Sequence, residues 1–305
     1  MAVVLVVALL GLIHRPAATP GRATGSRRGV IEQTAALCAL APAVRLSALL
    51  PPALAAVPPG DVKRAVVLGG SGFVGTRVCE QLVGLGVQVV SVSRGGRPTT
   101  AASGGWADRV EWVAADASDA RALGELMRGA DVAISAAGAI FGSGEAADRT
   151  NNAAPNVAAA AAAAAAGVRR FVLVSVSADV EPVTAPLVGG GYFRGKADAE
   201  AAVLAQFPPD RSLLIKPTFI YGGESFSLSP PRVSSAYGAL VDGALSAPPS
   251  RALASVAPGA VRLALLPPVS VDAVAAAAVA GALGLARGSV DGHDAIVAAA
   301  AALEK

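Results

Sequence analysis

The pair Tyr192 and Lys196 has residue types and a spacing that could support proton transfer. Positions i and i+4 share one face of a helix, so a phenol and an ammonium could both reach one bound group. A neighbouring ammonium favours the phenolate and lowers the tyrosine pKa, which would let the phenol act as a general acid or base. The pattern is common by chance, so its meaning depends on the elements that position it.

A glycine-rich turn supplies a second set of residues with a chemical role. It lies between the β-branched apolar run at 64–68 and the amphipathic helical pattern at 76–85. Gly69 suits the tight turn, Gly72 lets a pyrophosphate approach the backbone, and Gly75 lets the helix pack on the strand. The phosphates would lie at the helix N-terminus, where free N–H groups favour negative charge. The turn predicts a dinucleotide site at Gly69, Gly70, Ser71, Gly72, Phe73, Val74 and Gly75.

The elements around these residues alternate between strand and helix. Strand patterns recur at 87–93, 110–115, 131–136, 170–175 and 212–215, and helical patterns at 119–128, 156–166 and 197–206. This alternation predicts an α/β fold with a doubly wound parallel sheet of the Rossmann type over residues 61–222. Residues 223–305 would form a small C-terminal cap region with a helix at 236–245 and a returning strand and helix after 269. Asp272 is the predicted N-cap of that last helix.

The end of the second strand indicates which dinucleotide would bind. An NAD site usually has a carboxylate there, whereas this strand ends in Ser93 and Arg94, with Arg97 close behind. Guanidinium and hydroxyl groups complement a 2′-phosphate through charge-assisted hydrogen bonds. We therefore predict NADP(H), with NAD as the alternative and Arg94 as the discriminating residue.

Charge and cysteine content exclude several other classes of function. From Asp61 onward 20 basic residues face 21 acidic ones, so the predicted domain has no basic stripe for nucleic acid. Cys79 falls on the apolar pattern of the first helix and is predicted to be a buried structural thiol. No Cys/His spacing resembles a metal site, and the isolated His293 is assigned no role.

Residues 1–60 have the composition of a removable targeting presequence. An apolar run of twelve residues at 2–13 is followed by an acid-free, Arg-, Ser- and Pro-containing stretch at 14–28. Arg27 and Arg28 then precede an apolar stretch that ends in Ala-Leu-Ala-Ala at 53–56, which resembles a Tat-type transfer signal. We predict an organellar protein, in a plastid or alternatively a mitochondrion. We expect no transmembrane helix in the mature body.

Several stretches together resemble the short-chain dehydrogenase/reductase superfamily, in its extended or atypical branch. The matching stretches are 66–75 (V-V-L-G-G-S-G-F-V-G), Asp116, 136–138, 152–156 (N-A-A-P-N), 167–175, 192–196 (Y-F-R-G-K) and 216–222 (K-P-T-F-I-Y-G). Within the superfamily the chain is most similar to the group of the dehydrogenase-like accessory subunit of respiratory complex I. Organellar relatives linked to quinone biosynthesis belong to the same group.

The resemblance implies roles for further residues. Tyr192 would be the general acid, and Lys196 would also hold the nicotinamide ribose. Pro217 and the backbone near it would contact the nicotinamide, and Asp116 would lie near the adenine, while Asn152 would steady the end of the fourth strand. The remaining cofactor contacts that it implies are Ala117, Ala136, Ala137, Gly138, Thr218 and Ile220.

One departure from the family pattern bears on catalysis. Extended members usually place a carbonyl-polarising serine where this chain has Val176, between Ser175 and Ser177. Side chains alternate along a strand, so the two serines would share the face opposite Val176. Ser175 and Ser177 are nevertheless the candidate catalytic serines, because a small bulge could bring Ser177 to the site. The first hypothesis is an NADP(H)-dependent oxidoreductase with an apolar, quinone- or lipid-related substrate. The rival is a nucleotide-bound, non-catalytic accessory subunit of a membrane-associated complex. A sugar-nucleotide epimerase ranks third.

Overall fold

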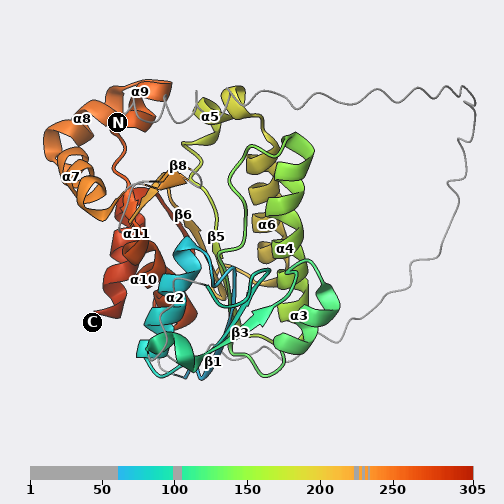
Figure 1. Ribbon diagram of the computed structural model, residues 1–305. Coiled ribbons are helices and arrows are strands. Elements are labelled where there is room, and N and C mark those ends of the chain that lie inside the picture. Colours follow the sequence, from blue (N-terminus) through green and yellow to red (C-terminus); the bar gives the residue numbers. More distant parts are fainter. Residues whose placement is uncertain (1–60, 99–104, 223–226, 229–230, 233, 305) are drawn as a thin grey trace, which may run out of the picture.

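The computed structural model describes residues 61–98, 105–222, 227–228, 231–232 and 234–304. Within these residues a seven-stranded, all-parallel sheet forms the centre of the molecule (Figure 1), in the order β11-β6-β5-β4-β1-β2-β3. The predicted doubly wound Rossmann sheet is therefore confirmed. The strands are β1 (Arg64–Leu68), β2 (Gln88–Ser93), β3 (Val110–Ala114), β4 (Val132–Ser135), β5 (Arg170–Val174), β6 (Ser212–Lys216) and β11 (Gly288–Asp291).

The strand order reverses at β1. The chain moves from β1 to β2 and β3 at one edge, then returns to β4 on the other side of β1. Val66 consequently pairs with Val90 of β2 and with Ala133 of β4. Ligands of open α/β sheets bind outside the carboxyl ends of strands at such a switch point.

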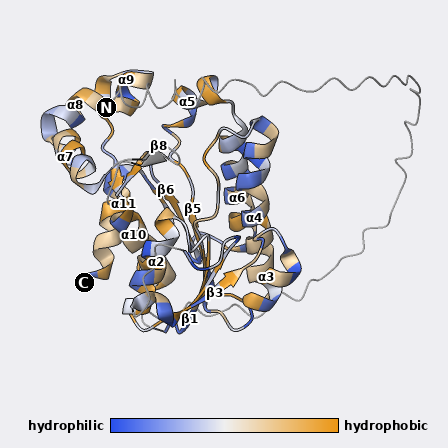
Figure 2. Cartoon of the chain, viewed as in Figure 1, coloured by the Kyte–Doolittle hydropathy of each residue, from blue (hydrophilic) through white to orange (hydrophobic). Residues whose placement is uncertain are grey.

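Helices cover both faces of the sheet (Figure 1). On one face lie α2 (Phe73–Gly84), α10 (Val271–Ala282) and α11 (Gly292–Ala300); on the other lie α3 (Ala120–Leu126), α4 (Glu145–Ala165) and α6 (Gly191–Gln206). Strands β3, β5 and β6 are mainly hydrophobic, whereas α4 and α6 have hydrophilic stretches (Figure 2). The central strands β1, β4, β5 and β6 bury apolar side chains on both of their faces, as the middle of a parallel sheet requires.

A ladder of buried amides fixes α4 to the end of β4. The side-chain Nδ2 of Asn152 donates to Ala139 O at 3.0 Å, and the backbone N–H of Ala139 donates to Asn152 Oδ1 at 3.3 Å. One turn later, Asn156 Oδ1 accepts from Ser135 Oγ at 2.5 Å. The predicted steadying role of Asn152 is confirmed. The ladder places α4 beside the switch point even though Pro155 interrupts its hydrogen bonding.

A cap lies beyond the carboxyl ends of the central strands (Figure 1). The short strands β7 (Ile220–Tyr221) and β10 (Val269–Ser270) pair in parallel beneath it, and β8 (Ser227–Leu228) pairs with β9 (Pro231–Arg232). Its helices are α7 (Ser235–Ser246), α8 (Pro248–Val256) and α9 (Gly259–Leu265), and α9 contacts α5 (Glu181–Val188). Short 3₁₀ turns lie at Trp106–Arg109 and Ala301–Leu303.

Several elements differ from the sequence-based expectation. Helices α4 and α6 begin earlier than expected, and α5, α8, α9 and β11 were not predicted. The assignment of Asp272 as an N-cap was wrong: Ser270 is extended and its Oγ accepts from the Ala273 amide at 3.0 Å, so Asp272 already lies in the first turn of α10. Residues 1–60, with the predicted presequence, lie outside the described residues. Among the described residues, no helix is both long and apolar enough to cross a membrane.

Candidate cofactor and active site

A cleft of about 570 Å³ lies at the switch point, beyond the carboxyl ends of β1, β2 and β4. Ten residues predicted from the sequence line it: Gly69, Ser71, Gly72, Ser93, Arg94, Asp116, Ala117, Ala136, Ala137 and Gly138. The sequence reasoning missed nine others: Val92, Gly95, Ala115, Ser118, Ala139, Thr150, Asn151, Ala154 and Pro155. Four of the missed residues come from α4, whose first half was not predicted to be helical.

The glycines of the turn have the roles expected of a dinucleotide fingerprint. Gly69 has φ of +73°, and a Cβ there would lie 2.9 Å from Ala136 O. A Cβ on Gly75 would lie 2.1 Å from Gly69 O, so only glycine lets α2 start this close to the turn. Gly72 is the N-cap of α2, without a capping side chain and without an acid in the first turn. The helix N-terminus thus faces the cleft as an anion site.

Side chains at the end of β2 form the wall beside this turn. Ser71 Oγ donates to Ser93 Oγ at 2.8 Å, and Ser93 Oγ donates to Gly96 O at 3.0 Å. Arg94 lines the cleft and is exposed. Arg97 does not line it, because its guanidinium pairs with Asp108 at 2.6 Å. The structure therefore brings Ser93 and Arg94 to the cleft but directs Arg97 away from it.

Asp116 closes the far end of the cleft. Its Oδ1 accepts hydrogen bonds from the amide and the hydroxyl of Ser118, at 2.9 and 2.8 Å. These bonds favour the carboxylate and hold the pKa of Asp116 below its usual value, and Arg94 contributes in the same direction. The Asp116 carboxylate could therefore accept a hydrogen bond from a polar group of a ligand in the cleft.

Tyr192 and Lys196 occupy the first two turns of α6. Lys196 is buried, and its Nζ donates to Val174 O at 3.1 Å. A Cβ on Gly138 would lie 3.0 Å from that Nζ, so the ammonium reaches the backbone that lines the cleft. Burial lowers the pKa of Lys196 to about 8, against an opposing effect of Glu200.

The Tyr192 phenol lies in apolar surroundings. Its ring meets the rings of Phe141 and Phe193 edge-on, with centroids 5.8 and 5.1 Å away. Burial raises the pKa of Tyr192 to about 12. The expectation of a lowered Tyr192 pKa is therefore wrong, because desolvation of the phenol raises it.

The hydroxyls of the two serines after β5 are bound to groups other than Tyr192. Ser175 Oγ donates to Glu200 Oε1 at 2.5 Å, and Ser177 Oγ accepts from the Asp179 amide at 3.3 Å. Val176 instead packs in the apolar cluster that contains Tyr192. The predicted catalytic roles of Ser175 and Ser177 thus have no support from the geometry, whereas the predicted placement of Val176 on the opposite face agrees with it.

The segment after β6 holds the loop at Ser177 without lining the cleft. Pro217 O accepts from the Ser177 amide at 3.0 Å, Thr218 Oγ1 donates to Pro267 O at 3.4 Å, and Ile220 packs on the core. Of the predicted turn residues, Gly70, Phe73, Val74 and Gly75 also lie outside the lining. Within the described chain, no group of three His, Cys, Asp or Glu side chains could hold a metal ion.

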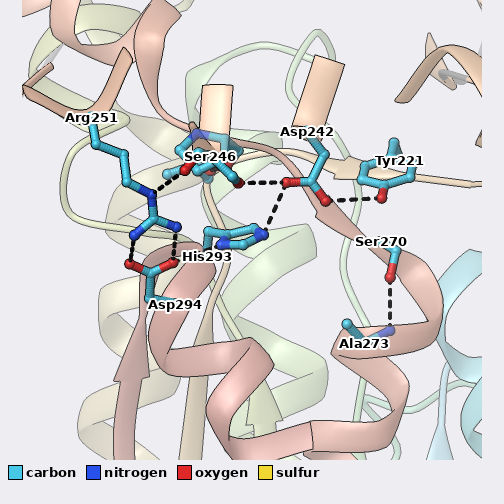
Figure 3. A network of polar contacts seen from close by, with 10 residues as sticks. Tyr221, Asp242, Ser246, Arg251, Ser270, Ala273, His293 and Asp294 are labelled. Carbon is cyan, nitrogen blue, oxygen red and sulfur yellow. Dashed lines mark hydrogen bonds and ion pairs between the residues drawn. The ribbon is translucent and has the colours of Figure 1, made fainter. Parts of the chain in front are cut away.

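A polar network fixes the cap to the Rossmann body (Figure 3). Asp242 of α7 accepts from the Tyr221 hydroxyl at 3.1 Å and contacts His293 Nε2 of α11 at 3.0 Å. The other ring nitrogen of His293 lies 2.8 Å from Asp294, which also pairs with Arg251 of α8. Sequence reasoning missed this role because His293 has no partner nearby in the sequence except Asp294.

The comparisons with known proteins agree with this geometry. Residues 69–206 match the model of a family described as NAD(P)H-binding. Over 165 residues the chain is 41% identical to an uncharacterized chloroplastic protein of Arabidopsis thaliana, covering 53% of each. Over 83 residues it is 34% identical to MIOREX complex component 2 of Saccharomyces cerevisiae, covering 26% of this chain and 30% of that one. The matches thus span about half of the first relative and under a third of the second.

A solved structure shows the same fold. The chain superposes on UDP-N-acetylglucosamine 4-epimerase from Methanobrevibacter ruminantium M1 with a TM-score of 0.52 and 16% identity, covering 75% of this chain and 76% of that one. The Rossmann-type fold that the resemblance implies is therefore confirmed. The chain contains an NAD(P)-binding Rossmann domain.

Proposed function

We propose that this chain, which contains an NAD(P)-binding Rossmann domain, binds NADP(H) in the switch-point cleft and is an organellar oxidoreductase for an apolar substrate. The observation that supports this most directly is the turn from Gly69 to Gly75, where added side chains would collide with backbone and the N-cap of α2 is left open. Such a cradle suits the pyrophosphate of a dinucleotide.

Arg94 supports NADP(H) over NAD. It is exposed at the end of β2 beside Ser93, and both residues line the cleft. A 2′-phosphate placed there would receive a guanidinium and a hydroxyl, whereas a carboxylate, which NAD sites use at this position, is absent from the described end of this strand. NAD remains the alternative cofactor.

Tyr192 and Lys196 would perform the proton chemistry. The nicotinamide supplies the hydride when it is bound. Lys196, whose Nζ donates to Val174 O near Gly138, would contact the nicotinamide ribose. Tyr192 carries a proton that it would donate to a substrate oxygen, although its raised pKa makes it a weaker acid than a free tyrosine.

The surroundings of Tyr192 favour an apolar substrate. The cluster around it contains Val176, Phe193 and Phe219, and the cap covers it with Leu263 and Leu266 of the α9 region. A strongly polar ligand such as a sugar nucleotide would lose hydrogen bonds there, whereas a quinone or a lipid carbonyl would bury apolar surface. This is the basis for proposing a quinone- or lipid-related substrate.

The second candidate is a nucleotide-bound accessory subunit that does not turn over. The observation that favours it is Ser175, whose hydroxyl is bound to Glu200, while Val176 takes the place of the polarising serine. The match to a component of the yeast MIOREX complex favours membership of a protein complex, and the partner that we propose is a membrane-associated complex.

Nucleotide extraction and turnover assays separate the two candidates. We expect NADP(H) in extracts of the purified full chain, and NADPH oxidation with short-chain quinones or apolar aldehydes. Tyr192→Phe should slow oxidation roughly 100-fold while NADPH affinity is retained, because one proton donor is removed. Tyr221→Phe is the matched control and should keep the rate, since its hydroxyl is bound to Asp242. Bound NADPH without oxidation, and full complementation by Tyr192→Phe, would establish the accessory role.

The organellar location has its own test. The 41% identical relative is chloroplastic, which favours the plastid over the mitochondrion. A reporter fused to residues 1–60 should enter plastids and lose the presequence near Pro59. Import into mitochondria alone would assign the other organelle, and a cytosolic reporter would refute the targeting proposal.

A further inference from the structure

The loop between β4 and α4 connects the cleft to Tyr192. Gly138 and Ala139, at its start, line the cleft. Two residues further on, the Phe141 ring meets the Tyr192 ring edge-on, with the centroids 5.8 Å apart. Phe141 and Tyr192 lie outside the cleft lining, and both are half-buried. The loop therefore follows the route from the cleft to the Tyr192 phenol.

Buried side chains of α4 hold this loop in place. Asp148, which is 2% exposed, accepts from the backbone N–H groups of Gly142 and Ser143, both at 3.0 Å. Asn152 fixes the start of the loop through its two hydrogen bonds with Ala139. The backbone on both sides of the aromatic residue is therefore held by hydrogen bonds, which is what a side chain that selects a ligand requires.

The side chains that this loop presents are apolar. Ile140 is 46% exposed, and Phe141 adds a half-buried ring beside the phenol. Phe193 also meets the Tyr192 ring edge-on, at 5.1 Å. Aromatic rings gain from stacked or edge-on contact beyond the burial of their apolar area. A planar conjugated ring beside Tyr192 would therefore be favoured over an aliphatic chain.

We propose that Phe141 contacts the substrate and determines its class, a carbonyl compound built on a planar conjugated ring, such as a quinone. The inference rests on the proposed function, in which the substrate lies between the cofactor in the cleft and Tyr192, and it favours the quinone over the lipid carbonyl. Phe141 carries it because this ring belongs to the loop that lines the cleft and also contacts Tyr192.

Calorimetric titrations of the full chain saturated with NADP⁺ test this proposal. The probes are 2,3-dimethyl-1,4-naphthoquinone and 2-dodecanone, an aliphatic ketone with as many carbon atoms. We expect the native chain to bind the quinone more tightly than the ketone. Phe141→Leu should weaken quinone binding about tenfold and ketone binding by less than about twofold, because an aromatic contact is lost while an apolar side chain is kept.

Leu204→Ala is the matched control. Leu204 is 42% exposed and lies about three turns after Tyr192 on α6, so its truncation should change the affinity for neither probe. Equal losses for both probes in Phe141→Leu would indicate a displaced Tyr192 and would overturn the proposal. Unchanged quinone affinity in that variant, or a native chain that binds NADP⁺ but not the quinone, would overturn it too.

Two further outcomes are distinguishable from these. If Phe141→Leu does not fold, Phe141→Met is judged by the same criterion, because its side chain is also apolar and non-aromatic. A native chain that binds no NADP⁺ refutes the proposed function instead. The two probes are then titrated into the chain alone, and the same selective loss of quinone affinity decides whether Phe141 contacts the ring.

Discussion

Arg94 is the residue at which the cofactor preference can be measured most selectively. Arg94→Asp would replace the guanidinium with a charge that repels a 2′-phosphate. We expect NADPH affinity to fall roughly 100-fold, because a charge-assisted hydrogen bond is lost and a repulsion is added, while NADH affinity changes little. Fluorescence titration with both nucleotides measures the two affinities.

Arg97 offers the matched control for this measurement. It lies three residues away, but its guanidinium is engaged by Asp108 and does not line the cleft. Arg97→Asp should therefore leave the preference for NADPH unchanged. Equal losses for NADPH and NADH in Arg94→Asp would show that Arg94 does not contact the 2′-phosphate.

The sequence predicted single residues well where a local pattern determines their position. The turn from Gly69 to Gly75 lies directly between β1 and α2, and Ser93 and Arg94 lie at the end of β2. Their positions therefore follow from elements within a few residues of them. Cys79 is buried as predicted, and burial raises its pKa to about 12. Arg97 and Ser175 could not be placed in this way, because their partners Asp108 and Glu200 lie farther along the chain.

At the scale of elements, the contact between α2 and the β1 turn depends on Gly75. Gly75→Val would push its side chain into the Gly69 carbonyl, which is backbone and cannot rotate away. We expect the free energy of unfolding to fall by about 2 kcal/mol, which is typical of overpacked core substitutions. We also expect NADPH affinity to fall, because the turn would shift. Gly84→Ala on the same helix meets nothing within 4 Å and should be neutral or slightly stabilising. A free energy of unfolding of Gly75→Val in urea equal to that of the unsubstituted chain would contradict this account.

The docking of the cap depends on a second glycine. A Cβ on Gly238 of α7 would lie 2.2 Å from the Tyr221 ring, which is buried against the body. Gly238→Val should therefore separate α7 and α8 from the body and expose their amides to hydrogen exchange, while the central strands stay protected. Gly243→Ala, on the same helix with nothing within 4 Å, should leave exchange unchanged. Unaltered protection of α7 in Gly238→Val would show that the cap is held elsewhere.

Element prediction failed where tertiary contacts override local pattern. The first half of α4 is polar around Asp148 and Asn152, yet these side chains are buried and bound to the loop after β4, which stabilises the helix. The edge strand β11 is short and alternates partly buried with exposed residues, and it is identifiable only through its pairing with β6. The local sequence of neither the first half of α4 nor β11 indicates the contact that stabilises it.

At the scale of the whole molecule, the polar groups of the cleft and the apolar surroundings of Tyr192 are distinct. Arg94, Ser93 and the N-terminus of α2 line the cleft and suit phosphates, whereas Tyr192 lies in an apolar cluster with residues of the cap. Lys196 does not line the cleft, but its Nζ reaches the backbone at Gly138, which does. In the proposed function, a dinucleotide would extend from the switch point toward Tyr192.

Calorimetric titration of the full chain with NADPH tests the central claim, that this cleft binds NADP(H). The account predicts one site with micromolar or tighter affinity, weaker binding of NADH, and loss of the NADPH signal in Gly72→Val, because a Cβ at this cleft-lining position would lie 3.0 Å from Gly69 O and the larger side chain would distort the turn. No heat of binding from a folded native chain, or unchanged NADPH affinity in Gly72→Val, would contradict it.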